Sequence, residues 1–139
     1  MPNLSALLGS SFVGSQGSQG VQSTQGVQGS ILTNVPQNLK TTSYTLLASD
    51  VGKHVSTNAG VIVPISTFFP GDTITIYNNS SADITISKQS GQEANITMYL
   101  AGTATNTTNR TLAQRGLCTL LCIVGGSTPT FVIAGSGLS

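Results

Sequence analysis

The chain has 139 residues, which is the size of a single domain. Only 6% of them are charged and the formal net charge is +1, so no basic field would attract nucleic acid or an anionic membrane. The longest apolar runs are well short of the roughly 20 residues that a membrane-spanning helix needs, and we expect neither nucleic acid nor a membrane as a partner.

Residues 1–13, MPNLSALLGSSFV, form an apolar start to a polar chain. Three of the leucines have the spacing of one helical face, but so short a helix is not stable alone. The segment lacks the positively charged start of a signal peptide. We interpret it as a peptide that anchors the chain to another protein, with a disordered start as the alternative. The anchoring side chains are Leu4, Leu7, Leu8, Phe12 and Val13.

Residues 14–29 read GSQGSQGVQSTQGVQG and repeat with a period of three. In a collagen-like triple helix, three extended chains wind together and only glycine fits at the axis, at every third position. The alternative is a flexible Gly/Ser/Gln linker, but a linker has no reason to keep this phase. The sequence therefore predicts a short collagen-like stalk. Its axial positions are Gly14, Gly17, Gly20, Ser23, Gly26 and Gly29.

The stalk alone is too weak to hold three chains together. Its triplets contain no proline, and Ser23 replaces one axial glycine, a substitution that locally disrupts a triple helix. A trimeric domain behind the stalk would raise the effective concentration of the three chains and fix their register. The period of three therefore predicts that the C-terminal domain is a homotrimer.

Residues 30–42 are a transition, and residues 43–139 alternate between apolar and polar side chains as β-strands do. Exposed helix formers such as Glu, Lys and Arg are rare, which disfavours helices. We expect an all-β, jelly-roll-like sandwich or barrel knob of eight or nine short strands. The expected strands lie at 43–47, 53–57, 61–64, twice within 73–87, within 94–102, at 117–124 and at 130–134.

Two of these segments carry further predictions. Residues 73–87, TITIYNNSSADITIS, are expected to form a hairpin around a four-residue turn. Residues 117–124 are apolar on both faces, which indicates a central strand or one that lies between subunits. Cys118 and Cys122 are about 13 Å apart on such a strand, too far for a disulfide, and we expect two buried thiols.

The order of anchor peptide, GxQ stalk and β-domain resembles small virion structural proteins of tailed bacteriophages, cyanophages in particular. The β-domain resembles a module at the ends of phage tail-fibre and virion proteins, over about residues 43–135. This resemblance implies a trimeric virion component and carries over no catalytic residue. The matching pieces are Tyr44-Thr45-Leu46, Asp50-Val51-Gly52-Lys53, Val63-Pro64, Phe69-Pro70-Gly71-Asp72, Ile76-Tyr77-Asn78, Ile84-Thr85-Ile86 and Phe131-Val132-Ile133-Ala134-Gly135.

The turn residues in these pieces have simple interpretations. Gly52, Gly60 and Gly71 are expected to have positive φ, and Asp50 is expected to form a weak surface pair with Lys53.

We predict no catalytic, metal-binding or cofactor-binding residue and no cofactor. The chain has four acidic residues and one histidine, His54. Glycoside cleavage needs two carboxylates about 5 to 9.5 Å apart, and Asp72 and Asp83 are the candidate pair because they flank the two strands of 73–87. Polar strand ends are the favoured interpretation of both, and His54 is too isolated for a catalytic triad or a metal site.

The leading hypothesis is a non-enzymatic bacteriophage virion structural protein, made in the host cytoplasm and located at the virion surface. It would be a homotrimer anchored to another virion protein through residues 1–13, with the β-knob outward. A capsid decoration or head fibre is slightly favoured, because so short an anchor suits a crevice in a preassembled lattice. The alternatives are a tail or baseplate fibre that binds a host surface glycan or protein, an adhesive module outside any virus, and a fibre-borne glycan-degrading enzyme.

Overall fold

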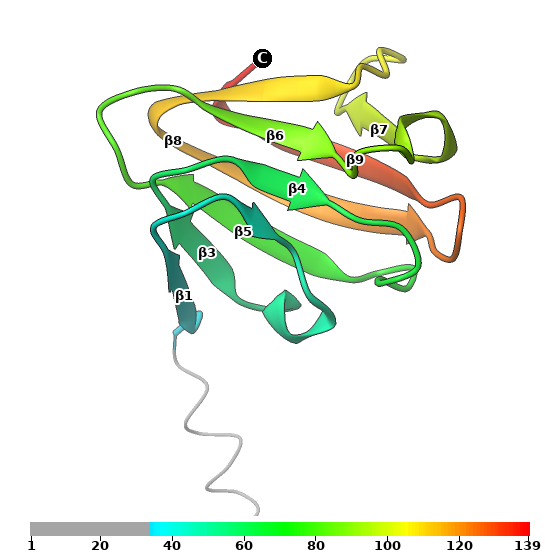
Figure 1. Cartoon of the computed structure of the whole chain (residues 1–139), viewed down its shortest axis with the longest axis horizontal. Helices are drawn as coiled ribbons and strands as arrows, with labels where there is room; N and C mark the ends of the chain where they lie inside the picture. The colour runs from blue at the N-terminus through cyan, green and yellow to red at the C-terminus, as the bar shows by residue number, and fades with distance from the viewer. Residues whose placement is uncertain (1–33) are drawn as a thin grey trace, which may run out of the picture. The chain divides into compact units, whose positions relative to one another are not determined.

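The computed structural model describes residues 34–139, and these residues form an all-β domain (Figure 1). The all-β prediction is therefore confirmed. Among the described residues, the helical segments are two single 3₁₀ turns at Ala48–Asp50 and Glu93–Asn95. The strands are β1 (Gln37–Lys40), β2 (Tyr44–Thr45), β3 (His54–Thr57), β4 (Val61–Val63), β5 (Thr73–Asn78), β6 (Ile84–Lys88), β7 (Thr97–Leu100), β8 (Asn109–Val124) and β9 (Thr130–Leu138).

The first six strands form two parallel ladders. Strands β1, β3 and β5 pair in one ladder, and β2, β4 and β6 pair in the other. Successive strands alternate between the ladders, so each full turn of the chain, which we call a coil, adds one strand to each ladder (Figure 1). These parallel ladders differ from the antiparallel pairing of a jelly roll.

The expected hairpin at 73–87 is wrong, although both of its strands form. Strands β5 and β6 belong to different ladders, and each pairs with β8 instead of with the other. Alternation of side chains shows which residues of a strand face the core but not which strand is its partner. The polar residues between them connect one ladder to the other rather than closing a hairpin.

Strand β8 joins the two ladders. Its first half, at 109–112, pairs antiparallel with β6, and its second half, at 117–121, pairs antiparallel with β5. Strand β9 runs along the other edge of β8, and β7 pairs in parallel with β9. The outcome is one strongly curved, barrel-like sheet, with β8 as the central strand that the sequence predicts at 117–124.

The corner of β8 lies between its two halves. Leu112 is opposite Leu138 and Leu117 is opposite Ser136, so the residues between Leu112 and Leu117 bulge opposite Gly137. Bulges bend a strand sharply. Arg115 has a φ of 59°, and a Cβ on Gly116 would lie 2.7 Å from the Leu112 side chain.

The core lies between the two ladders and under β8 and β9. Phe68 and Phe131 meet edge to face, with their ring centroids 6.1 Å apart. Cys118 and Cys122 are free and buried, as predicted. The larger fully buried side chains include Leu46, Ile74, Ile76, Ile86, Ile96, Met98, Leu112, Leu120 and Ile133; burial of each contributes roughly 1.5 to 3 kcal/mol.

A buried carboxylate closes the first coil. Asp50 accepts hydrogen bonds from Asn38 Nδ2 at 2.6 Å, from the Tyr44 hydroxyl at 2.8 Å and from the Leu47 amide at 2.8 Å. These bonds link β1, β2 and the turn that follows. The expected surface pair with Lys53 is therefore wrong, because the Asp50 side chain points inward and is fully buried.

The glycine predictions are confirmed at two positions of three. Gly52 and Gly71 have φ values of 79° and 97°. Gly60 is not among the positive-φ glycines; a Cβ there would lie 3.2 Å from the Thr85 carbonyl oxygen, so close approach of two strands explains this glycine. Strand β1 lies inside the stretch 30–42 that we treat as a transition.

The anchor at 1–13 and the stalk at 14–29, with all the residues named for them, lie outside the described residues. No helix in residues 34–139 is long and apolar enough to cross a membrane.

Candidate subunit interface

One outer surface of the domain is formed by β5, the second half of β8, and β9. Their registers place outward side chains in rows across the three strands, such as Tyr77, Leu117 and Ser136. None of these side chains is charged, and we call this surface the uncharged face. It consists of Thr73, Thr75, Tyr77, Leu117, Thr119, Leu121, Ile123, Val132, Ala134 and Ser136.

Large apolar side chains on this face are exposed. Leu117 is 50% exposed and Ile123 is 43% exposed, and Val124 at the end of β8 is 48% exposed. Between them on the same strand, Cys118, Leu120 and Cys122 point into the core and are buried. Strand β8 is thus apolar on both sides in its second half, which is the pattern that the sequence shows at 117–124. This exposed apolar surface makes the uncharged face a candidate interaction site.

The uncharged face continues onto the neighbouring strands of the first ladder. Thr75 is opposite His54 of β3, and His54 is opposite Gln37 of β1. The His54 ring nitrogen Nε2 lies 3.2 Å from Gln37 Oε1. His54 therefore makes a surface contact with an amide, and the structure places no carboxylate in that hydrogen bond.

The outer surface of the second ladder is more polar. It presents Thr85 and Ser87 of β6 opposite Thr111 and Asn109 of β8. The outward apolar residue of β4 is Ile62, which is half-buried. The two surfaces share the lack of charge but differ in their apolar content.

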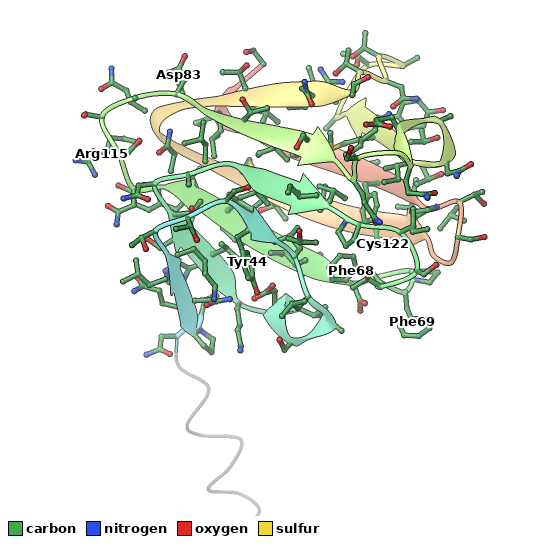
Figure 2. All side chains as sticks on the ribbon, in the orientation of Figure 1. Tyr44, Phe68, Phe69, Asp83, Arg115 and Cys122 are labelled. Carbon is green, nitrogen blue, oxygen red and sulfur yellow. The ribbon has the colours of Figure 1, made fainter. Side chains whose placement is uncertain are left out.

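Charged side chains gather at the ends of the strands. Asp83 and Arg115 lie near the corner of β8, and Figure 2 shows both at the same end of the domain. Asp83 Oδ1 accepts a hydrogen bond from the Gln114 amide at 3.3 Å. Arg115 Nη1 donates to Asn79 at 3.3 Å.

Asp72 lies beside Cys122 near the C-terminal end of β8, away from the corner where Asp83 lies. Its carboxylate accepts a hydrogen bond from the Phe69 amide at 2.9 Å, and its carbonyl accepts one from the Cys122 amide at 2.9 Å. The candidate carboxylate pair for glycoside cleavage is therefore not formed, and both residues are polar strand ends. Residues 34–139 contain no cluster of metal-ligand side chains.

Three buried ionisable residues were missed from the sequence. Asp50 lies in a turn, where no periodicity predicts its burial. Lys88 and Arg110 could have been found, because each follows the alternation of a strand: Lys88 continues the inner positions of Ile84 and Ile86, and Arg110 stands two residues before Leu112.

Burial also changes the acidity of one hydroxyl beside Asp50. Loss of solvent raises the pKa of Tyr44, and the hydrogen bond to the Asp50 carboxylate raises this pKa further. Tyr44 therefore stays protonated and keeps donating to Asp50. The Lys40 ammonium lies 4.4 Å from the centre of the Tyr44 ring.

One aromatic side chain points away from the domain. Phe69 is 74% exposed, while its neighbour Phe68 points into the core (Figure 2).

In comparisons with known proteins, no family model matches this chain and no curated protein matches it significantly.

Proposed function

We propose that this chain is a non-enzymatic structural subunit of a bacteriophage virion, and that three copies associate through the uncharged face. The observation that carries the proposal is the row of outward apolar side chains on the central strand, where Leu117 and Ile123 are exposed and Leu121 between them is half-buried. Burying them against other copies removes apolar area from water, at about 25 cal/mol per Å². The face has no charge to desolvate, which would otherwise oppose association.

The number of copies comes from the sequence upstream of the domain. Glycine at every third position of residues 14–29 except Ser23 has a physical reason when three chains share one axis. In this proposal the domains trimerise, hold the three stalks in register, and leave residues 1–13 to bind another virion protein. The appendage is made in the host cytoplasm and stands on the virion surface with the β-domain outward.

We propose that the appendage stands on the capsid. The apolar side chains of residues 1–13 suit a crevice in a preassembled lattice, which favours a capsid decoration or head fibre over a tail or baseplate fibre that touches a host glycan or protein. Labelled antibody on intact virions should mark the head. Labelling of the tail alone would contradict the capsid location and leave the trimer in place.

A matched pair of substitutions tests the stalk. Gly20→Ala puts a methyl group at an axial position and should lower the melting temperature of a collagen-like circular-dichroism signal by several degrees, because only glycine fits there. Ser15→Ala changes a non-axial position and should leave it unchanged. Equal tolerance of both substitutions in the full chain would show that residues 14–29 are a linker.

A further inference from the structure

Two positively charged side chains point into the barrel at one end of the β6–β8 pair. Lys88 and Arg110 are each only 6% exposed. Arg110 is opposite Ile86, and Lys88 stands two residues after Ile86 on the same side of β6. The two cations are therefore diagonal neighbours, which are roughly 7 to 8 Å apart between Cα atoms.

The hydrogen bonds of both side chains go to neutral acceptors. Lys88 Nζ donates to Asn106 Oδ1 at 2.8 Å. Arg110 Nη2 donates to the Thr105 carbonyl at 2.7 Å and to the Thr105 hydroxyl at 3.2 Å. Buried charges in proteins are normally paired with an opposite charge, so two like charges held by neutral groups are an unusual arrangement.

Each cation also makes burial of the other in its charged form less favourable. Burial and the Arg110 charge lower the pKa of Lys88, while the charge of Glu93 acts in the opposite direction. The environment therefore disfavours the charged form of Lys88 on balance, and the group that accepts its hydrogen bond is neutral.

One donor of this cluster has no partner within the described residues. Arg110 Nε is buried and forms no hydrogen bond to any group of residues 34–139, although nearly all buried donors in folded proteins are paired. The guanidinium is held in place through Nη2, so Nε stays directed at a position without a protein acceptor. An acceptor from solution at that position would complete the site.

We propose that a small inorganic anion of the size of chloride binds beside Arg110 Nε and offsets the charges of Lys88 and Arg110. A water molecule would satisfy Nε but would leave both charges unbalanced. The loop that carries Thr105 and Asn106 covers the site, and Asn106 Oδ1 also accepts the Met98 amide at 2.9 Å. The proposed site therefore lies where hydrogen bonds from β6, β7 and β8 meet this loop, independently of how many copies associate.

Thermal unfolding of the full chain tests the site. Sodium chloride is exchanged for sodium gluconate at constant ionic strength, so that the screening of charges is the same in both salts. Gluconate is too large for the site, so the two salts differ in whether their anion can bind there. Chloride should raise the unfolding temperature with the logarithm of its concentration above the dissociation constant, by about 5 °C or more at a hundredfold excess over that constant. Equal unfolding temperatures in the two salts would overturn the proposal.

Two variants and a control locate the effect. Arg110→Gln and Lys88→Gln should each abolish the chloride dependence, whereas Arg115→Gln, at the exposed corner of β8, should retain it. If a variant fails to fold, a crystal of the unaltered chain grown in bromide gives the answer directly. An anomalous peak within hydrogen-bond distance of Arg110 Nε supports the proposal, and water there without bromide overturns it.

Discussion

Both halves of β8 bury alternate side chains, but their outer sides differ. In the first half, Arg110 and Leu112 are buried while Asn109 and Thr111 face outward. In the second half, Cys118, Leu120 and Cys122 are buried, and Leu117 and Ile123 face outward. One strand thus crosses from a polar outer surface to an apolar one at the corner of Arg115 and Gly116.

This difference distinguishes the apolar residues of β8 that the core requires from those that it does not require. A strand with one side in a core needs apolar residues only at alternate positions. At 109–112 the outer side of β8 has no apolar residue, and the buried positions hold Leu112 and the cation Arg110. The second half also has apolar residues on its outer side, and this outward leucine and isoleucine contribute no core packing within one chain. The proposed association of copies would give these residues a physical role, and the following predictions test the contrast between the two halves.

The largest expected effect is loss of the trimer in Leu117→Lys. Three lysines would then have to be buried without partners in the interface, which costs several kcal/mol. Light scattering after size exclusion should give the mass of one chain. The matched variant Thr111→Lys, outward on the first half, should keep the mass of the unaltered protein. Dissociation of both variants, or of neither, would contradict the claim that only the second half of β8 lies in the interface.

Alkaline pH should act on the inner side of the second half. Burial raises the pKa of Cys118 to about 12, from an ordinary value of 9.0. The unfolded chain loses this proton near pH 9 while the folded chain retains it, so stability falls as pH rises from 9 to 12. The full loss is about 4 kcal/mol, at 1.36 kcal/mol per pH unit.

Cys118→Val removes this titration and nearly conserves volume. Urea unfolding at a series of pH values should therefore show a much smaller alkaline loss for this variant than for the unaltered protein. Parallel curves for the two proteins would mean that another group causes the alkaline loss.

Close contact between β8 and β9 should make Gly135 irreplaceable. A Cβ at this position would lie 2.1 Å from the Leu117 carbonyl oxygen and 2.4 Å from Cys118 Cα. Because backbone atoms cannot yield, Gly135→Ala should lower the free energy of unfolding by about 3 kcal/mol or more. Gly91→Ala is the control: it has space but a φ of 82°, and should cost about 1 kcal/mol. Equal losses would argue against the β8–β9 register.

The sequence predicts the positions of several strands in this fold, but it does not predict which strands pair. Alternation placed β3, β4, β5 and β6 within a residue or two, because inward and outward positions are local properties. The partners of these strands were not predictable, since parallel coils join residues far apart in the chain. Strand β1 was missed because its sequence QNLK lies at an edge and has little apolar alternation.

The candidate interface was predictable in part. Two apolar sides at 117–124 indicated a central or intersubunit strand, and β8 is central. The residues that complete the face, such as Tyr77 and Val132, come from strands whose neighbours are known only from the register. Burial of Lys88 and Arg110 depends on the same pairing.

The smallest expected effect lies at the corner between the halves. Arg115 has a left-handed φ of 59°, which costs a residue with a Cβ roughly 1 to 2 kcal/mol. Arg115→Gly should therefore stabilise the domain by up to about 1 kcal/mol, as the exposed contact with Asn79 contributes little. Arg115→Ala keeps the strain and should give no gain in urea unfolding. A glycine variant less stable than the alanine variant would contradict this account of the corner.

Association through the uncharged face is the central claim, and the mass of the unaltered full chain in solution tests it most directly. Sedimentation equilibrium at micromolar concentration should give three times the mass of one chain, with no dependence on salt, because the face carries no charge. A stable monomer would contradict the claim, and it would also remove the reason to interpret residues 14–29 as a triple-helical stalk.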